Sequence, residues 1–399
     1  MKKEQAVSFD EAIALSLDLA SIKPHNKSWV SIFDALGRTL ACEVICKKNL
    51  PSYNNAAMDG FAFKYEEGLS ELRINTTILA GSVVEACLGT HECYKIRTGA
   101  QVPSDADTMI PFEECISYDE TKIVLPSSIK KGNALRLKGE EESVGSVLLH
   151  EGTFLSSREI ALLASQGISM VEVYKKLQIA VFSTGNELKS AWENANEDEI
   201  YDINALSLLS LLAEHGFVAH YCGVIPDNLE AATVYFSQMK QYDVLVTSGG
   251  VSMGEADFVE RALLTNGFTA SFHGINIKPG KPTMMGKMGE TIVASMPGNP
   301  LAAYVNAFLF LIPLLKKQQG QKKFDFEAIT ARNAEPFKVK SGRVNLVLGT
   351  YANGEFHVFG ENKYGSGMVK PLVNSNALWI SDEEINGVEA GFEIQILLF

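Results

Sequence analysis

Two segments end in glycine-containing turns that could hold a phosphorylated ligand. The runs VFSTGNEL (181–188) and LVTSGGVSMGEADFV (245–259) each predict an apolar strand followed by a turn. Gly249 and Gly250 let the backbone approach a ligand closely, and a helix that begins after such a turn presents N–H groups to a phosphate. An ordinary strand-to-helix turn uses the same residues, so one turn alone is weak evidence. Two such turns in one region favour a binding site.

Four acidic residues follow the ends of predicted strands: Glu187, Asp227, Glu255 and Asp257. Ligands of open parallel sheets bind at this edge. Several carboxylates beside a phosphate indicate a hard divalent cation such as Mg²⁺, which prefers oxygen ligands. Each acid taken singly is also explained as a solvated loop residue, or as a first-turn residue favoured by the helix dipole.

Two rigid loops could receive an anion. INIKPGKPTMMG (275–286) places Lys278 and Lys281 on either side of a Pro-Gly turn. Two cations on a fixed turn of an acidic protein could bind an oxyanion or a phosphate, although a solvated surface turn has the same pattern. SMPGNPLAAYVNAFLFLI (295–312) fixes a loop directly before a long apolar helix, which makes it a second candidate anion site. Rigidity for packing alone is the alternative.

Two further clusters lie outside this region. NNAAMDGFAF (54–63) contains Asp59, which an Asp-Gly turn would also explain. RTGAQVPSDAD (97–107) and LRLKGEE (135–141) carry basic residues close to acids, which is also the pattern of surface ion pairs of little energetic value.

The elements around these residues predict a multidomain α/β protein. Strand and helix patterns alternate through 177–315, which is typical of a doubly wound domain with a parallel sheet. Residues 8–41 carry two helical patterns, the first with Ser8 as N-cap and Glu11 as its capping-box partner. We predict a helical linker domain (1–45 and 144–171), a β-rich domain (46–143), an α/β domain (172–325) and a C-terminal small β barrel (326–399).

Composition excludes several classes of protein. The chain has 399 residues, and its formal charge of −13 argues against a nucleic-acid binder while leaving a small anionic substrate open. The N-terminus lacks the apolar core of a secretory signal, and the most apolar stretch, 302–315, is too short to span a membrane. The six cysteines form no CxxC pair, which favours reduced thiols in a cytoplasmic protein.

The motifs NAAMDGFAF, RTGAQVP, RLKGEE, FSTGNEL, TSGGVSMGEAD, KPGKP and MPGNP stand in the order and at the separations found in the MoeA family. The chain resembles that family, which includes the E domain of gephyrin, over nearly its full length. The resemblance implies a molybdopterin molybdenumtransferase that binds adenylylated molybdopterin, inserts molybdate and releases AMP with Mg²⁺ as cofactor. It also implies four structural regions and an elongated homodimer whose cleft is shared between subunits.

The resemblance carries roles to individual residues. It implies catalytic roles for Asp59, Glu187, Asp227, Asp257, Lys278 and Lys281. It implies substrate binding by Thr98, Arg136, Ser183, Thr184, Gly185, Ser248, Gly249, Gly250, Pro297, Gly298, Asn299, Pro300 and Ser366. It implies metal binding by Glu187, Asp227, Asp257 and Glu141. Two positions depart from the family pattern: Glu141 stands where aspartate is common, and Asn186 stands where an acid is common.

Two other functions compete with molybdate insertion. The α/β domain resembles domains that adenylylate molybdopterin with ATP, but the additional β-rich regions favour insertion. A non-catalytic scaffold that holds pterin intermediates is disfavoured by the retained acids and lysines. The expected partners are adenylylated molybdopterin, molybdate, a second copy of the chain, the adenylyltransferase and the molybdoenzyme-maturation proteins, with no nucleic acid and no membrane. Molybdate and tungstate, nearly equal in size and charge, are not distinguished.

Overall fold

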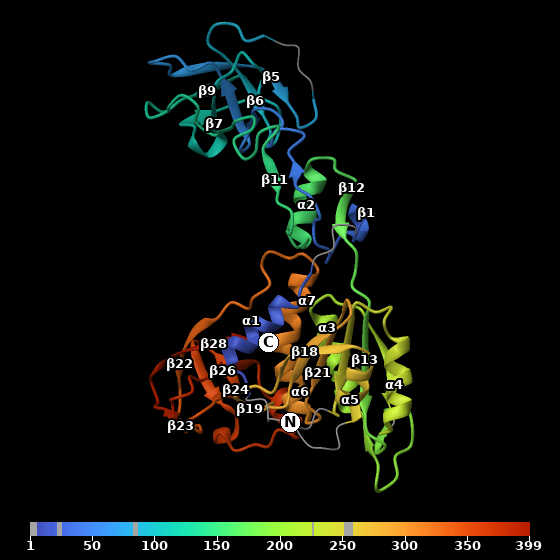
Figure 1. Ribbon diagram of the computed structural model, residues 1–399. Helices are drawn as coiled ribbons and strands as arrows, with labels where there is room; N and C mark the ends of the chain where they lie inside the picture. The colour runs from blue at the N-terminus through green and yellow to red at the C-terminus, as the bar shows by residue number, and fades with distance from the viewer. Residues whose placement is uncertain (1–5, 22–25, 83–86, 226, 251–257) are drawn as a thin grey trace. The chain divides into compact units, whose positions relative to one another are not determined.

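The computed structural model describes residues 6–21, 26–82, 87–225, 227–250 and 258–399, and it forms two compact units (Figure 1). The larger unit comprises Met1–Ala41, Gly152–Ser156 and Met170–Phe399. The smaller unit comprises Cys42–Glu151 and Ser157–Ser169. The predicted α/β and C-terminal regions therefore share the larger unit, the predicted β-rich region lies in the smaller unit, and the predicted helical linker is divided between the two.

A six-stranded sheet forms the centre of the larger unit, in the order β16-β13-β17-β21-β20-β18. The strands are β13 (Ile179–Thr184), β16 (Ala219–Ile225), β17 (Val244–Ser248), β18 (Phe268–His273), β20 (Met284–Met288) and β21 (Thr291–Met296). The first four strands in this order are parallel, and β20 and β18 run antiparallel to their neighbours. Every residue of β13, β17 and β21 is buried, which explains their unbroken small or apolar character.

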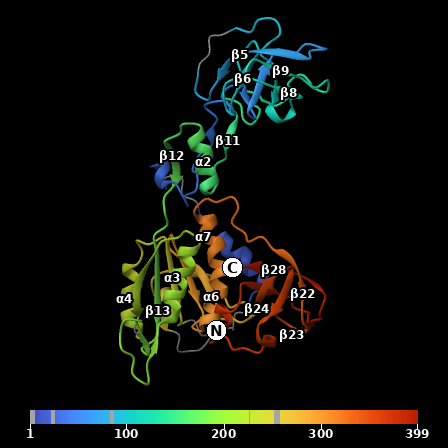
Figure 2. The ribbon, with the colours of Figure 1, turned by 180° about the vertical axis from the view of Figure 1, so that it is seen from behind.

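Helices cover both faces of this sheet, as the doubly wound prediction requires. They are α3 (Ile203–Glu214), α4 (Leu229–Gln238), α5 (Phe258–Thr265) and α6 (Pro300–Asn306). Val181 packs in one core with α3 and α6, whereas its neighbour Phe182 packs in a second core with α4 and α5. Side chains alternate across a strand, so consecutive residues of β13 support opposite layers. Figure 2 shows α3 and α6 on the same side of the sheet.

The apolar segment after β21 is a helix of the core. It runs from α6 through a π-helical turn (Ala307–Leu311) into α7 (Ile312–Gln318). Among the described residues, Pro300–Gln318 is the helix that by length and composition could cross a membrane, and 78% of its most apolar window is buried inside the structure. Phe308 and Phe310 are almost fully buried, which agrees with the predicted buried helix.

The C-terminal region is a small closed barrel, as predicted. Its strands are β22 (Ile329–Asn333), β24 (Val344–Ala352), β25 (Glu355–Val358), β26 (Ala377–Ile380) and β28 (Glu393–Leu398). They follow the order β24-β25-β22-β28-β26, and pairing of β24 with β26 closes the ring. Strand β19 (Ile277–Lys278) pairs with β24 in parallel, so the Lys278 turn is attached to the barrel. Short elements complete the region: β23 (Phe337–Lys338), β27 (Gly387–Val388) and α8 (Lys370–Val373).

The smaller unit contains a second six-stranded sheet, in the order β7-β4-β6-β5-β9-β8. Its strands are β4 (Gly60–Phe63), β5 (Glu71–Ile78), β6 (Glu92–Ile96), β7 (Thr108–Pro111), β8 (Ser117–Tyr118) and β9 (Lys122–Val124). Gly60 is required here, because a Cβ at this position would lie 2.1 Å from the carbonyl oxygen of Ile110. The close approach of β7 therefore explains the glycine that follows Asp59. The unit also holds β2 (Val44–Ile45), β3 (Asn55–Ala56), β10 (Leu135–Arg136), β11 (Val147–Leu149) and α2 (Ser157–Ser165).

The N-terminal predictions are half right. Helix α1 (Phe9–Asp18) begins after Ser8, whose hydroxyl accepts a hydrogen bond from the Glu11 N–H at 3.2 Å. The second predicted helix of 8–41 is wrong. That stretch contains β1 (Lys27–Ser31), which pairs antiparallel with β12 (Met170–Tyr174), and a single 3₁₀ turn at Ile32–Asp34. A partner strand more than 130 residues away leaves no local signal in the sequence.

Candidate functional site

A cavity of about 980 Å³ lies at the carboxyl edge of the sheet in the larger unit. Many of the predicted site residues line it: Thr184, Gly185, Glu187, Asp227, Ser248, Gly249, Gly250, Gly298, Asn299 and Pro300. They come from the turns that follow β13, β16, β17 and β21, because the carboxyl ends of parallel strands share one edge. These predicted residues therefore lie together at one cavity, and their roles in binding or catalysis stay predictions.

The turn after β17 is shaped by its glycines. Gly249 and Gly250 have φ values of +83° and +64°, which side chains other than glycine rarely adopt. A Cβ on Gly250 would lie 2.3 Å from Cγ2 of Val259 in α5. The Thr184 hydroxyl at the end of β13 donates to the Ser248 carbonyl at 3.4 Å. Both turns are thus held against each other with bare backbone at the cavity wall.

Four acidic residues line the cavity: Glu187, Glu199, Asp202 and Asp227. Glu199 pairs with Lys189 at 3.3 Å, whereas Glu187 and Asp227 follow the neighbouring strands β13 and β16. Glu187 and Asp227 are both exposed, and among the described residues neither has a cation within ion-pair distance. Asn186 accepts a hydrogen bond from the Asp227 N–H at 3.3 Å, so it joins the two acidic turns. The glutamate carboxylate folds back over Gly185, where a Cβ would lie 2.7 Å from its oxygen. Gly185 therefore leaves space for the Glu187 carboxylate. Asn186, which departs from the family pattern, connects the turn after β13 to the turn after β16.

The start of α3 contributes residues that the sequence reasoning missed. Asp202 caps α3 by accepting from the Ala205 N–H at 3.1 Å, and the Ser183 hydroxyl donates to the same carboxylate at 2.8 Å. Asn204 donates to the Ser248 hydroxyl oxygen and to the Gly298 carbonyl, each at 2.7 Å. The signal available was Asp202 as an N-cap residue directly before the helix, in the sequence YDINALS. Ser183 acts here through Asp202 and does not itself line the cavity.

The PGNP loop joins the cavity to the C-terminal region. The Asn299 amide donates to the Ser366 hydroxyl at 2.8 Å, and the Leu301 N–H donates to the Ser366 carbonyl at 3.1 Å. Gly367 lines the cavity beside them, whereas Pro297 and Ser366 do not. Ser366 therefore holds the loop at the start of α6.

The two lysines of the KPGKP turn are exposed and do not line this cavity. Their turn is fixed by Asn306 of α6, whose amide donates to the Gly280 carbonyl at 2.9 Å and to the Thr283 hydroxyl at 2.6 Å. The Lys281 carbonyl accepts from the Ile275 N–H at 2.8 Å. The backbone is thus rigid, as predicted, while both ammonium groups extend from it on long side chains.

Asp59 in the smaller unit has a complete set of partners. Its Oδ1 accepts from the N–H and the hydroxyl of Thr98, both at 2.8 Å, and its Oδ2 accepts from Arg97 at 2.6 Å. The Thr98 N–H, then the Thr98 hydroxyl and then Arg97 lower the pKa of Asp59 to about 2. The Arg97 guanidinium also lies 5.8 Å from the ring centre of Phe112. The carboxylate is therefore ionised at any physiological pH and fixed in orientation.

Arg136 and Glu141 form a second charged group in the smaller unit. Arg136 pairs with Glu140 at 3.3 Å and with Glu141 at 3.5 Å. The Glu140 carboxylate also accepts from the Leu137 N–H at 2.7 Å. Glu141 thus has a cationic partner within its own unit.

The predicted metal ligands are only partly assembled by the described residues. Glu187 and Asp227 line the cavity, Glu141 belongs to the other unit, and Asp257 lies outside the described residues. Within the described part of the chain, no group of three His, Cys, Asp or Glu side chains could hold a metal ion. Mg²⁺ is commonly held by one or two carboxylates together with substrate phosphates, and Glu187 and Asp227 fit that mode of binding.

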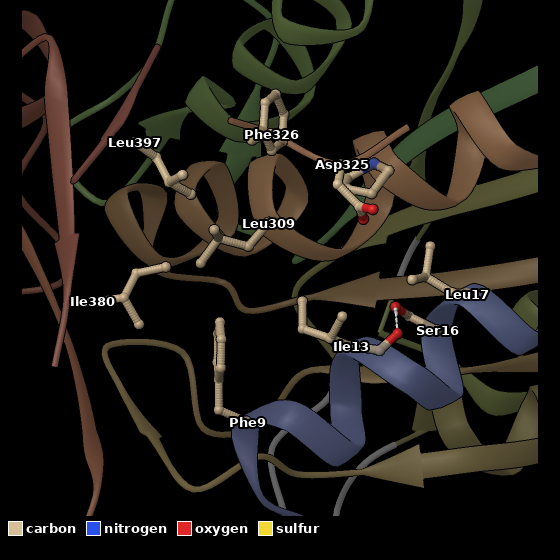
Figure 3. Close-up of a pocket in the computed structure, with 10 residues that line it drawn as sticks. Phe9, Ile13, Ser16, Leu17, Leu309, Asp325, Phe326, Ile380 and Leu397 are labelled. Carbon is tan, nitrogen blue, oxygen red and sulfur yellow. Dashed lines mark hydrogen bonds between the residues drawn. The ribbon is translucent and has the colours of Figure 1, made fainter. Parts of the chain in front are cut away.

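A second, smaller cavity of about 170 Å³ lies between α1 and the π-helical turn (Figure 3). Its lining is mostly apolar and includes Phe9, Leu309 and Leu397. Asp325 and Ser16 are its polar members, and the Ser16 hydroxyl donates to the Ile13 carbonyl at 2.8 Å. It has neither glycine turns nor convergent charges, so it does not suit a phosphorylated ligand.

The fold and the large cavity define a doubly wound α/β protein with a glycine-lined site at the sheet edge and additional N- and C-terminal regions. Residues 180–317 match the family model of a probable molybdopterin binding domain. Residues 7–167 match the MoeA N-terminal region (domains I and II), and residues 330–399 match the MoeA C-terminal region (domain IV).

Full-length relatives give the same assignment. A Haemophilus influenzae protein named molybdopterin molybdenumtransferase is 32% identical, over 96% of this chain and 98% of its own length. A Staphylococcus epidermidis protein of the same name is 28% identical, over 100% and 97%. The crystal structure of the molybdopterin biosynthesis MoeA protein from Pyrococcus horikoshii OT3 matches with a TM-score of 0.84 and 27% identity, over 99% of this chain and 100% of that one. The chain belongs to the MoeA family.

Proposed function

We propose that this protein inserts molybdate into adenylylated molybdopterin and releases AMP, forming molybdenum cofactor. The observation that carries the proposal is the cavity of about 980 Å³ in a chain of the MoeA family. Glycine turns meet there with Glu187 and Asp227, which pair with no cation among the described residues. Cavities of this size are typical of sites for ligands as large as a nucleotide joined to a second ring system.

The proposal gives each half of the substrate its own part of the cavity. The half-buried backbone of Gly250 suits a phosphate group, because a peptide N–H group binds an anion without a competing side chain. The Gly249 N–H already donates to the Met296 carbonyl at 3.2 Å, so Gly249 contributes shape rather than a donor. Tyr201 and Ile203, both exposed at the cavity, offer apolar surface to a flat ring. The PGNP loop also lines the cavity, through Gly298, Asn299 and Pro300.

The reaction requires hydrolysis of a phosphoanhydride. Water attacks the AMP phosphorus, the P–O bond to the pterin phosphate breaks, and the pterin keeps its terminal phosphate while AMP leaves. Bound Mg²⁺ would offset the negative charge that develops on the phosphate oxygens. Glu187 and Asp227 are the residues that would hold it, and Asp257 is a further proposed ligand. Their carboxylates also orient the attacking water by accepting its hydrogen bonds.

Molybdate is a second anion, and the acids of the cavity would repel it. We assign its attraction to Lys278 and Lys281, whose turn is fixed by Asn306. We assign two groups of the smaller unit to the same reaction. They are the ionised Asp59 with Thr98 and Arg97, and Arg136 with its acidic partners. The proposal includes a homodimer in the cytoplasm, which light scattering and cell fractionation test.

The test of the function supplies the purified protein with adenylylated molybdopterin, molybdate and Mg²⁺. We expect AMP and active molybdenum cofactor to appear together, and only when molybdate is present. Formation of adenylylated pterin from ATP and molybdopterin would replace the proposal with adenylyltransferase activity. Tight substrate binding without AMP release would replace it with a pterin-holding scaffold.

A further inference from the structure

We infer that Asn204 is a positioning residue that joins two neighbouring loops in the lining of the large cavity, the turn after β17 and the PGNP loop. Its amide nitrogen donates to the Ser248 hydroxyl oxygen and to the Gly298 carbonyl, each at 2.7 Å. Ser248 ends β17 before the glycine turn, and Gly298 lies in the loop before α6. One side chain thus joins the β17 turn to the PGNP loop. This inference rests on the function proposed above.

The orientation of the amide follows from its partners. The Gly298 carbonyl can only accept, so the group that faces it must be the NH₂ of the side chain. A carboxylate of the same shape cannot donate to that carbonyl and would repel it. Asn204→Asp is therefore a near-isosteric change that breaks the link to the Gly298 loop.

The helix that carries Asn204 is fixed in the sheet. Asp202 caps α3 and accepts from the Ser183 hydroxyl at 2.8 Å, which ties the helix start to β13. The direct bond from the Ser248 hydroxyl to the Pro297 carbonyl is longer, at 3.4 Å. The Gly249 N–H also donates to the Met296 carbonyl at 3.2 Å, where β17 pairs with β21. The two Asn204 bonds of 2.7 Å therefore add a side-chain connection beyond the end of this backbone pairing.

The other end of the Asn204 amide has no partner. Its Oδ1 is buried and has no hydrogen-bond partner in the described part of the chain. A buried acceptor without a partner lowers stability, and an apolar residue would not have one. The two donor bonds between residues that line the cavity are therefore what this asparagine contributes.

The experiment measures AMP binding by calorimetry in the presence of Mg²⁺, using the full-length protein and two matched variants. Asn204→Asp removes the donors at the cavity. Asn266→Asp is the control, because the Asn266 amide also donates to two carbonyls, of Thr233 and Ala262, at 3.0 and 2.9 Å. Asn266 directly follows α5, its side chain connects α5 to α4, and it does not line the cavity.

We expect Asn204→Asp to weaken AMP binding at least tenfold, while Asn266→Asp stays within twofold of the wild type at a similar loss in melting temperature. An affinity of Asn204→Asp within twofold of the wild type, or an equal loss in both variants, would overturn the inference. If Asn204→Asp does not fold, Asn204→Ser tests the same bonds with a shorter side chain and the same criteria. A wild-type protein that does not bind AMP would instead contradict the proposed function.

Discussion

Asp59 of the smaller unit and the pair Glu187 and Asp227 of the larger unit are held in opposite ways. In the smaller unit, both oxygens of Asp59 have partners, with Thr98 on one and Arg97 on the other. In the larger unit, Glu187 and Asp227 line an open cavity, and the described residues place no cation beside them. The fold itself balances the charge of Asp59, whereas the described residues do not balance the charges of Glu187 and Asp227.

This difference separates two kinds of work. A carboxylate that already accepts three hydrogen bonds is a rigid, permanently charged group, which suits orientation of a substrate. Two carboxylates without cations at glycine turns suit a charge that arrives with the ligand, such as Mg²⁺ bound to phosphates. The comparison therefore predicts that metal dependence belongs to the larger unit alone.

The largest expected effect is that of Glu187→Gln. We expect molybdate insertion to fall by about 10³-fold, since a preorganised charge at the reacting phosphate is lost. The Mg²⁺ concentration needed for half-maximal rate should rise as well. AMP release measured over a Mg²⁺ titration gives both quantities.

Two controls frame that result. Glu230→Gln, an exposed first-turn acid of α4 outside the cavity, should leave the rate within about twofold. Asp59→Asn should lower the rate but leave the Mg²⁺ requirement unchanged. A shifted Mg²⁺ requirement in Asp59→Asn would contradict the division of work between the units.

Gly185→Ala tests the position of the Glu187 carboxylate. The added Cβ would lie 2.7 Å from that carboxylate, at a φ of +142°. We expect the side chain to move and the rate to fall by about 10²-fold, because small misplacements of a reacting group are costly. Gly216→Ala is the matched glycine, with a φ of +82° and nothing within 4 Å of the added atom. It should lower the melting temperature and keep the rate, and an equal loss of rate in both would count against the positioning of Glu187.

Lys278→Ala should act on molybdate rather than on the nucleotide. We expect the KM for molybdate to rise about tenfold, as for loss of one charge-assisted hydrogen bond. AMP affinity, measured by calorimetry, should change less than twofold. Equal losses of molybdate use and AMP affinity would show that this lysine belongs to the nucleotide site.

Among the substitutions of site residues, the smallest effect on the rate is expected for Arg97→Met. Asp59 would keep both Thr98 hydrogen bonds, which are the larger causes of its low pKa, so the pKa should rise only part of the way from about 2 toward 3.8. Asp59 stays ionised at neutral pH, and the rate there should change less than about fivefold. NMR titration of the Asp59 carboxyl measures the pKa directly.

The sign of the pH effect on stability follows. Because the folded pKa is depressed, the contribution of Asp59 to stability is complete above its unfolded pKa and is lost as pH falls through the folded value. Arg97→Met raises the folded pKa, so the pH range over which this stability is lost should become narrower at its acid end. An unchanged pKa would show that the Arg97 contact does not form in solution.

The part of the site predicted best is the part encoded locally. The strands before Gly185 and Gly249 are fully buried in a parallel sheet, so each is a continuous apolar run that ends in glycine. Topology then brings the carboxyl ends together, and the acids after them follow. The barrel and the doubly wound sheet were predictable for the same reason.

What could not be predicted depends on distant contacts. Asn204 looks like an ordinary polar residue of an amphipathic helix until Gly298, which lies 94 residues away, is placed beside it. The strand at Lys27–Ser31, which lies in the stretch 8–41 predicted to be helical, depends on pairing with Met170–Tyr174. The hydrogen bond that Asn186 accepts from the Asp227 N–H is also a tertiary contact between two turns.

The most direct test of the account is a crystal structure of the protein with AMP and Mg²⁺ bound. We predict that the phosphate contacts the Gly249–Gly250 turn and that the metal lies between the phosphate and the carboxylates of Glu187 and Asp227. AMP bound elsewhere, or a metal held only by residues of the smaller unit, would contradict the account.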